Sequence, residues 1–125
     1  MLKRGFKDML AEANAVIEVL AVQDLNYALD EPEAVLVDVR DQAEREREGF
    51  IPGSLHASRG MLEFHADPES PMHISALKPE RSIILYCGTG GRSALAAKTL
   101  VDMGFQNVRS LAGGFAAWKQ SEQSL

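Results

Sequence analysis

The chain's only cysteine, Cys87, stands where an apolar run gives way to glycines. The segment Ser82–Ser93 reads Ser-Ile-Ile-Leu-Tyr-Cys-Gly-Thr-Gly-Gly-Arg-Ser. The apolar part predicts a buried strand, and the glycines predict a tight loop that opens a helix at Arg92. Such a loop directs backbone N–H groups and the positive end of a helix dipole at one small volume. We expect a thiol placed there to ionise easily and to act as a nucleophile.

The glycines argue against a purely structural role for this cysteine. A free cysteine is most often a small buried hydrophobic residue. A packed core has no use for three nearby glycines, whereas a loop whose amides converge on an anion needs positions without a Cβ. We therefore interpret the segment after the cysteine as an anion-binding loop made of Gly88, Thr89, Gly90, Gly91, Arg92 and Ser93.

Activation of Cys87 is within reach of such a loop. An ordinary thiol has a pKa of about 8.5 and is only a few per cent thiolate at about pH 7. Lowering a pKa by one unit takes about 1.4 kcal/mol, and a hydrogen bond to a charged group contributes about 1.5 to 3 kcal/mol. We expect the amides of residues 88–92, more than any single side chain, to favour the thiolate.

Three stretches of the chain together resemble the rhodanese family. A cysteine, four residues and an arginine, Cys87 to Arg92, followed by a helix, are similar to its active-site loop. Two further stretches match in the family's order: Val37-Asp38-Val39-Arg40 with Glu44 and residues 49–54 (Gly-Phe-Ile-Pro-Gly-Ser), and residues 113–118 (Gly-Gly-Phe-Ala-Ala-Trp). The matches extend from about Val35 to Trp118, with Phe50 where the family often has His.

The resemblance implies a rhodanese-type sulfurtransferase. In such an enzyme Cys87 attacks the outer sulfur of a small anionic donor such as thiosulfate and holds it as a persulfide. The sulfur then passes to a thiophilic acceptor such as cyanide or a thiol, including a protein thiol. No cofactor is implied, because the covalent persulfide carries the sulfur.

Other functions share parts of this pattern. A non-catalytic sulfur carrier or regulatory binding module would keep the same loop without turnover. A cysteine phosphatase or arsenate reductase also places an anion-binding loop after a nucleophilic cysteine, but the resemblance implies five residues between Cys and Arg there, and this chain has four. A nucleotide site is disfavoured, because a P-loop needs Lys where Arg92 stands and a dinucleotide motif needs Gly where Ser93 stands.

Charged residues near other strand ends are candidates for supporting roles. Asp38 and Arg40 follow the carboxyl end of a second predicted strand, so we expect them at the same edge of the sheet as Cys87. Asp38 is the candidate partner for Arg92, which either binds the anionic substrate or braces the loop. The alternative for Asp38 is a surface pair that contributes little. Arg59 is expected to add positive potential near the mouth of the site.

The composition of the chain argues against several classes of partner. The 125 residues fit one domain, and 46% hydrophobic with 25% charged residues is ordinary for a globular protein without a membrane partner. The net charge of -5 argues against nucleic acid. One cysteine forms no internal disulfide, which fits a cytoplasmic protein. The three histidines lack metal-ligand spacing, so no metal is expected.

Alternating strands and helices predict an α/β fold with a rhodanese-like, mostly parallel sheet of about five strands and helices on both faces. The expected strands are Val16–Leu20, Ala34–Val39, Ser54–Ala57, Ser82–Tyr86 and Asn107–Leu111. The expected helices are Val22–Leu29, 41–48, Arg59–Phe64, Arg92–Met103 and Gly114–Gln120. The loop 65–79 contains three prolines and is expected to border the site.

Apolar residues at helical spacing also predict an amphipathic helix, Lys3–Asn14, ahead of the domain. We therefore divide the chain into a helical extension, 1–15, and one rhodanese-like domain, 16–125. The extension either docks on its own domain or pairs with another chain, which makes it the expected contact of an oligomer.

Overall fold

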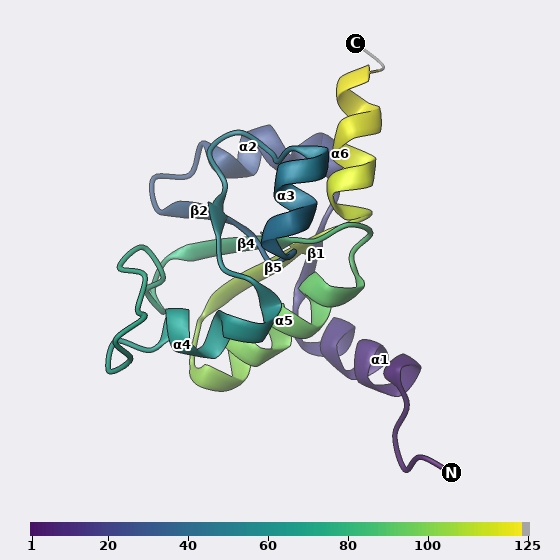
Figure 1. Cartoon of the computed structure of the whole chain (residues 1–125), viewed down its shortest axis with the longest axis vertical. Helices are drawn as coiled ribbons and strands as arrows, with labels where there is room; N and C mark the ends of the chain where they lie inside the picture. The colour runs from purple at the N-terminus through teal and green to yellow at the C-terminus, as the bar shows by residue number, and fades with distance from the viewer. Residues whose placement is uncertain (124–125) are drawn as a thin grey trace.

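The computed structural model describes residues 1–123 and contains a central parallel sheet between two groups of helices (Figure 1). The strands are β1 (Glu18–Leu20), β2 (Ala34–Asp38), β3 (Leu55–His56), β4 (Ser82–Tyr86) and β5 (Asn107–Leu111). Their order across the sheet is β1-β5-β4-β2-β3, and every neighbouring pair is parallel. The predicted α/β architecture with a five-stranded parallel sheet is confirmed.

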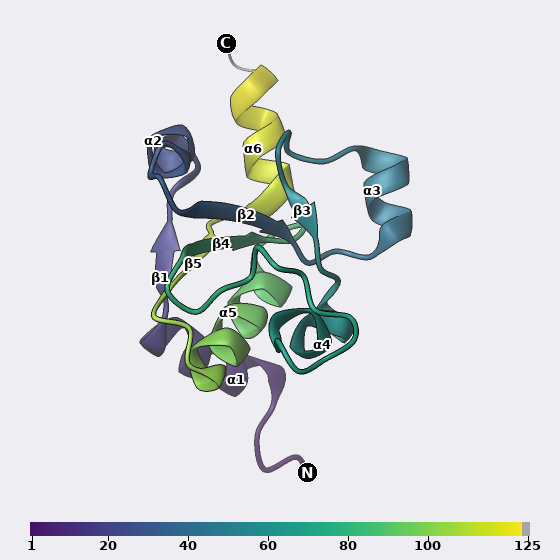
Figure 2. The same ribbon diagram turned by 90° about the vertical axis from the view of Figure 1, so that its left-hand side faces the viewer.

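The helices lie on both faces of this sheet (Figure 2). They are α1 (Phe6–Val16), α2 (Leu25–Leu29), α3 (Gln42–Glu48), α4 (Leu62–Ala66), α5 (Gly91–Met103) and α6 (Gly114–Gln123), with short 3₁₀ turns at Val22–Asp24 and Arg59–Met61. α4 and α5 cover one face, while α2 and α6 cover the other. Within the described residues, no helix combines the length and the apolar character needed to cross a membrane.

β4 is the centre of the core because both of its faces are covered. Ile83 and Leu85 belong to the apolar cluster under α4 and α5. Ile84 and Tyr86 belong to the cluster under α2 and α6. This two-sided burial explains the continuous apolar run in the sequence, and it fixes the position of the residue that follows, Cys87.

The helical extension packs on its own domain. α1 begins at Phe6 instead of Lys3, because Gly5 precedes the helix and its N–H donates to Asp8 Oδ2 at 2.9 Å. Ala13 is completely buried where α1 contacts α5. Of the two predicted arrangements, docking on the same chain is the one that the structure contains, and the Phe6 side chain stays exposed.

The long loop expected to border the site lies at the other end of β4. Its last part leads into Ser82, the first residue of β4, and the Gln106 N–H there donates to Pro79 O at 3.1 Å. Cys87 follows the opposite end of the same strand. The prediction that 65–79 borders the site is therefore wrong, because the connections before and after a strand meet opposite edges of a sheet.

Candidate active site

The loop between β4 and α5 wraps around the sulfur of Cys87. The Gly90 N–H donates to Sγ at 3.1 Å, and the Ser93 N–H donates at 3.4 Å. Gly90 has a φ of +115°, a left-handed conformation that favours glycine. The structure therefore shows backbone donors converging on the thiol, as the glycine pattern predicts.

The carbonyl groups of the same loop point away from the sulfur and towards α6. The Phe115 N–H donates to Cys87 O at 2.8 Å, and the Ala116 N–H donates to Gly88 O at 3.1 Å. The first N–H groups of a helix have no partner within the helix, so here they hold the loop. A Cβ on Gly114 would lie 2.4 Å from Cys87 O, which explains why this helix starts with glycine.

Two buried hydroxyls extend the loop's hydrogen bonds to the neighbouring strand. Ser93 Oγ lies 3.6 Å from Cys87 Sγ, 3.2 Å from Gly90 O and 2.8 Å from Ser110 Oγ. Ser110 lies on β5 and is 3% exposed. Sequence reasoning missed Ser110, because nothing in an ordinary strand serine indicates which distant residue it contacts.

The pKa of Cys87 results from two opposing effects. Burial raises it, because the side chain is only 1% exposed and desolvation disfavours a thiolate. Hydrogen bonds from the Ser93 hydroxyl and from the N–H groups of Ser93, Gly90 and Thr89 lower it and outweigh burial. The pKa of this thiol therefore lies below its ordinary value, and the thiolate is favoured.

Arg92 pairs with Glu44, not with Asp38. Its Nη1 lies 2.6 Å from Glu44 Oε1 and its Nη2 lies 2.9 Å from Oε2. This pairing lowers the pKa of Glu44 to about 2. Glu44 also accepts from the Asp41 N–H at 3.2 Å, and its own N–H donates to Asp41 Oδ1 at 2.9 Å, so the two residues form a capping box at the start of α3. The ion pair joins the Cys87 loop to the start of α3.

Asp38 is already occupied, which explains why that prediction is wrong. It accepts from Arg40 Nη2 at 2.9 Å, Arg45 Nη1 at 3.0 Å and the Tyr86 hydroxyl at 3.0 Å. Burial raises the pKa of Asp38, but these donors, Arg40 first, outweigh it and leave the pKa lowered. Asp38 and Arg40 are both completely buried.

The buried Asp38–Arg40 pair is connected to the site through Phe115. The Arg40 guanidinium lies 4.3 Å from the ring centre of Phe115, the residue whose N–H holds Cys87 O. Arg40 is therefore linked to Cys87 only through Phe115. A supporting role for Asp38 and Arg40 stays a prediction.

The Arg59 side chain contacts α4 and α5. Its Nη2 is 3.4 Å from Thr99 Oγ1 on α5, and its Nη1 is 3.8 Å from Glu63 Oε2 on α4. These contacts hold it against the middle of the α4–α5 layer instead of at the mouth of the loop. No group of three or more His, Cys, Asp or Glu side chains in residues 1–123 is placed to hold a metal ion.

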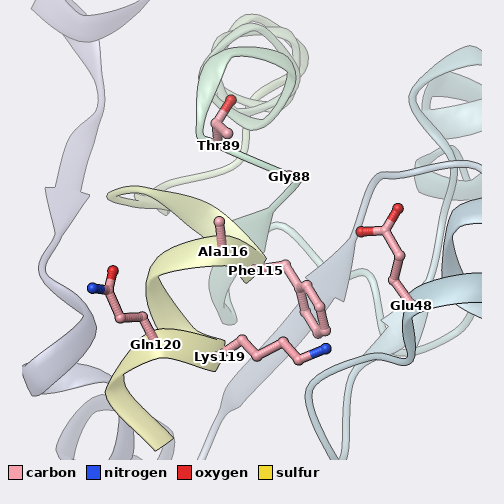
Figure 3. Close-up of a pocket in the computed structure, with 7 residues that line it drawn as sticks. All are labelled: Glu48, Gly88, Thr89, Phe115, Ala116, Lys119 and Gln120. Carbon is pink, nitrogen blue, oxygen red and sulfur yellow. The ribbon is translucent and has the colours of Figure 1, made fainter. Parts of the chain in front are cut away.

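A cavity of about 570 Å³ opens beside the loop. Figure 3 shows its walls, with the loop on one side, the first turns of α6 on another and the end of α3 opposite. It is lined by Glu48, Gly88, Thr89, Phe115, Ala116, Lys119 and Gln120. The α6 residues share one helix face, a spacing that the sequence shows, but the sequence does not show that this face lies beside the cysteine.

The chain is similar to known proteins in sequence and in fold. Thiosulfate sulfurtransferase GlpE of Coxiella burnetii is 36% identical over 85 residues, which cover 68% of this chain and 71% of the relative. The polysulfide-sulfur transferase homodimer of Wolinella succinogenes is 32% identical, with a TM-score of 0.74 over 94% of this chain and 83% of that chain.

A second solved structure is more similar. A protein of unknown function from Rhodopseudomonas palustris, described as a possible tyrosine phosphatase, is 46% identical with a TM-score of 0.90. The match covers 98% of this chain and 94% of that chain. The family model of the rhodanese-like domain matches residues 21–121, a range that includes all three resembling stretches. The chain therefore belongs to the rhodanese-like domain family.

Proposed function

We propose that this protein is a sulfurtransferase that moves sulfane sulfur through a persulfide on Cys87. The donor is thiosulfate or a similar anion, and the acceptor is cyanide or a thiol. The observation that carries the proposal is the convergence of the Gly90 and Ser93 N–H groups on Cys87 Sγ. The names of the Coxiella and Wolinella relatives support the same reaction class.

In the first step the Cys87 thiolate attacks the outer sulfur of thiosulfate. Its electron pair forms the new S–S bond, and sulfite leaves with the electron pair of the old one. The persulfide that results is again an anion. The N–H groups that stabilise the thiolate lie close enough to stabilise this terminal sulfur too, and α6 holds the loop in place through the carbonyls of Cys87 and Gly88.

In the second step the acceptor attacks the terminal sulfur of the persulfide. Cyanide becomes thiocyanate, or a thiolate becomes a new persulfide, and Cys87 leaves as the stabilised thiolate. No external oxidant or cofactor is needed, because the sulfur moves as a neutral atom and each leaving group, first sulfite and then the Cys87 thiolate, keeps the electron pair of the bond that breaks. Arg92 braces the loop through Glu44 while its side chain stays 44% exposed beside the donor's path.

The proposal has two rivals. The Rhodopseudomonas relative is described as a possible tyrosine phosphatase, and a sulfur carrier without turnover would keep the same loop. The loop has only four residues between Cys87 and Arg92, and its Gly90 and Ser93 N–H groups already converge on the sulfur. This tight enclosure favours attack on a sulfur atom over attack on a phosphoryl group.

Incubation with thiosulfate followed by intact-protein mass measurement tests the proposal. We expect the mass of one sulfur atom on the wild-type chain and none on Cys87→Ser, followed by thiocyanate formation when cyanide is added. A loaded persulfide that no acceptor removes would indicate a carrier. Hydrolysis of a phosphate monoester that is lost in Cys87→Ser, without sulfur loading, would overturn the proposal in favour of the phosphatase.

A further inference from the structure

The cavity beside the Cys87 loop is larger than the proposed small substrates require. Thiosulfate and cyanide have only a few heavy atoms each, whereas the cavity measures about 570 Å³. Cavities that hold organic ligands span about 300 to 1,000 Å³. Its walls are also mixed, with the Phe115 ring and the Ala116 methyl beside charged ends from Glu48 and Lys119 (Figure 3).

The charges around the cavity are unequally compensated. Glu48 pairs with Arg47 at 2.8 Å and lies 3.8 Å from buried Arg40. Arg92, at the loop, is bound by both oxygens of Glu44. Lys119 has no carboxylate partner among the described residues; its Nζ lies 5.9 Å from the Phe115 ring centre. Lys119 therefore presents an available positive charge to a ligand in the cavity.

The position of Lys119 relates this charge to the sulfur. Phe115 holds Cys87 O through its N–H, and Lys119 follows four residues later, about 6 Å along the helix axis. Gly88 and Thr89, which form the opposite wall, directly follow Cys87. A molecule in the cavity can therefore contact both the residues that directly follow Cys87 and the Lys119 side chain.

We propose that this cavity receives the acceptor as a small organic thiol that carries a carboxylate or sulfonate, with Lys119 as the residue that selects the anionic group. The inference rests on the proposed sulfurtransferase function and names its acceptor class. The body of the thiol covers Phe115 and Ala116, and its anionic end pairs with Lys119 Nζ.

The transfer step balances without further reactants. The acceptor thiolate attacks the terminal sulfur of the Cys87 persulfide and forms a new S–S bond with its own electron pair. The bond between that sulfur and Cys87 Sγ breaks, and its electron pair returns to Cys87 as the thiolate. The product is the persulfide of the acceptor, and nothing is oxidised or reduced overall.

The test uses two acceptors that share a short carbon chain and differ at the end away from sulfur. Protein loaded with thiosulfate and freed of excess donor is mixed at low salt with mercaptoethanesulfonate or mercaptoethanol, and the loss of persulfide is followed by intact mass. Each rate is divided by the cyanide rate of the same variant. We expect about a fivefold preference for the sulfonate in wild type, which corresponds to about 1 kcal/mol, the upper range of an exposed ion pair.

Variants of Lys119 test whether the charge of this residue causes the preference for the sulfonate. In Lys119→Gln we expect no preference, and in Lys119→Glu a preference for mercaptoethanol. Lys7→Gln, an exposed lysine on α1 outside the cavity, is the control and keeps the wild-type ratio. High salt reduces the wild-type preference, because screening weakens exposed pairs.

The outcomes separate this inference from the proposed function. If cyanide removes the persulfide but wild type and Lys119→Gln show equal ratios for the two thiols, the Lys119 inference is wrong and the sulfurtransferase stands. If thiosulfate loads no sulfur on the wild-type chain, the proposed function itself fails.

Discussion

At the scale of single residues, the chemistry of Cys87 depends on which of two effects on its pKa is larger. Burial of the side chain disfavours a charge, yet three N–H groups and the Ser93 hydroxyl favour it. A hydrogen bond to a charged group contributes about 1.5 to 3 kcal/mol, so several together exceed the desolvation that burial of one sulfur imposes. The same donors explain why we expect a buried cysteine here to be reactive instead of inert.

We predict that Ser93→Ala raises the pKa of Cys87. A folded-state pKa that is lowered means more thiolate above it, so losing a donor moves the onset of reactivity to higher pH. The pH dependence of alkylation by iodoacetamide measures this shift, and persulfide formation near neutral pH should fall about tenfold, the effect of about one charged hydrogen bond. Ser75→Ala, in the exposed part of the long loop, should match wild type. Equal titration of Ser93→Ala and wild type would show that this hydroxyl does not stabilise the thiolate.

At the scale of elements, the N-termini of α5 and α6 interact with different polar groups of the Cys87 loop. The start of α5 supplies the Gly90 and Ser93 N–H groups to the sulfur. The start of α6 binds the carbonyls of Cys87 and Gly88. The loop conformation therefore depends on a helix that begins 27 residues after the cysteine, counted from Cys87 to Gly114.

Gly114→Ala should damage both stability and reactivity. Its Cβ would lie 2.4 Å from Cys87 O and 2.9 Å from the carbonyl carbon of Gly88, at a φ of +58°. Gly104→Ala is the matched control, with a φ of +110° and nothing within 4 Å of its Cβ. We expect each variant to lose about 1 to 3 kcal/mol from backbone strain, measured by urea unfolding, with the larger loss in Gly114→Ala. Slower alkylation of Cys87 should occur in Gly114→Ala alone; the same slowing in Gly104→Ala would contradict the role of α6.

At the scale of the whole molecule, a buried ionic cluster connects the sheet to α3 and α6. Asp38 binds two arginines and the Tyr86 hydroxyl, and Arg40 packs against Phe115. Such a cluster does not make a protein more stable than an apolar core would, because both charges lose their hydration. Removing one charged partner of this cluster should lower the free energy of unfolding, since the charges that remain stay buried.

Asp38→Asn should therefore lower the free energy of unfolding by about 3 to 5 kcal/mol, because it leaves the completely buried Arg40 with only the half-exposed Glu48, 3.8 Å from its Nη1, as a countercharge. Asp102→Asn removes one partner of an exposed pair, Lys98 Nζ to Asp102 Oδ2 at 2.8 Å, and should cost less than about 0.5 kcal/mol. Chemical unfolding of both variants measures the difference. Similar losses in the two variants would show that the cluster is not the structural link described here.

The local features of this fold are predictable because they depend on neighbouring residues. β4 and β5 have the predicted bounds, and α5 begins one residue before its predicted start. The apolar run that ends at Tyr86 and the glycines that follow place the cysteine at a strand end. The position of 65–79 follows from the direction of β4. The connection before this strand and the loop after it lie at opposite ends of the strand.

The sequence by itself determined the order of strands and helices along the chain, the burial of β4, and the loop that surrounds Cys87. It did so because apolar periodicity and glycine positions act over a few residues. Only the tertiary structure decided that Arg92 pairs with Glu44, that Ser110 contacts Ser93, and that one face of α6 forms a cavity wall. Three carboxylates, Asp38, Asp41 and Glu44, lie within seven positions at and just after the end of β2. Which of them meets a given arginine depends on how the elements pack, because a side chain pairs with the partner that packing brings within reach.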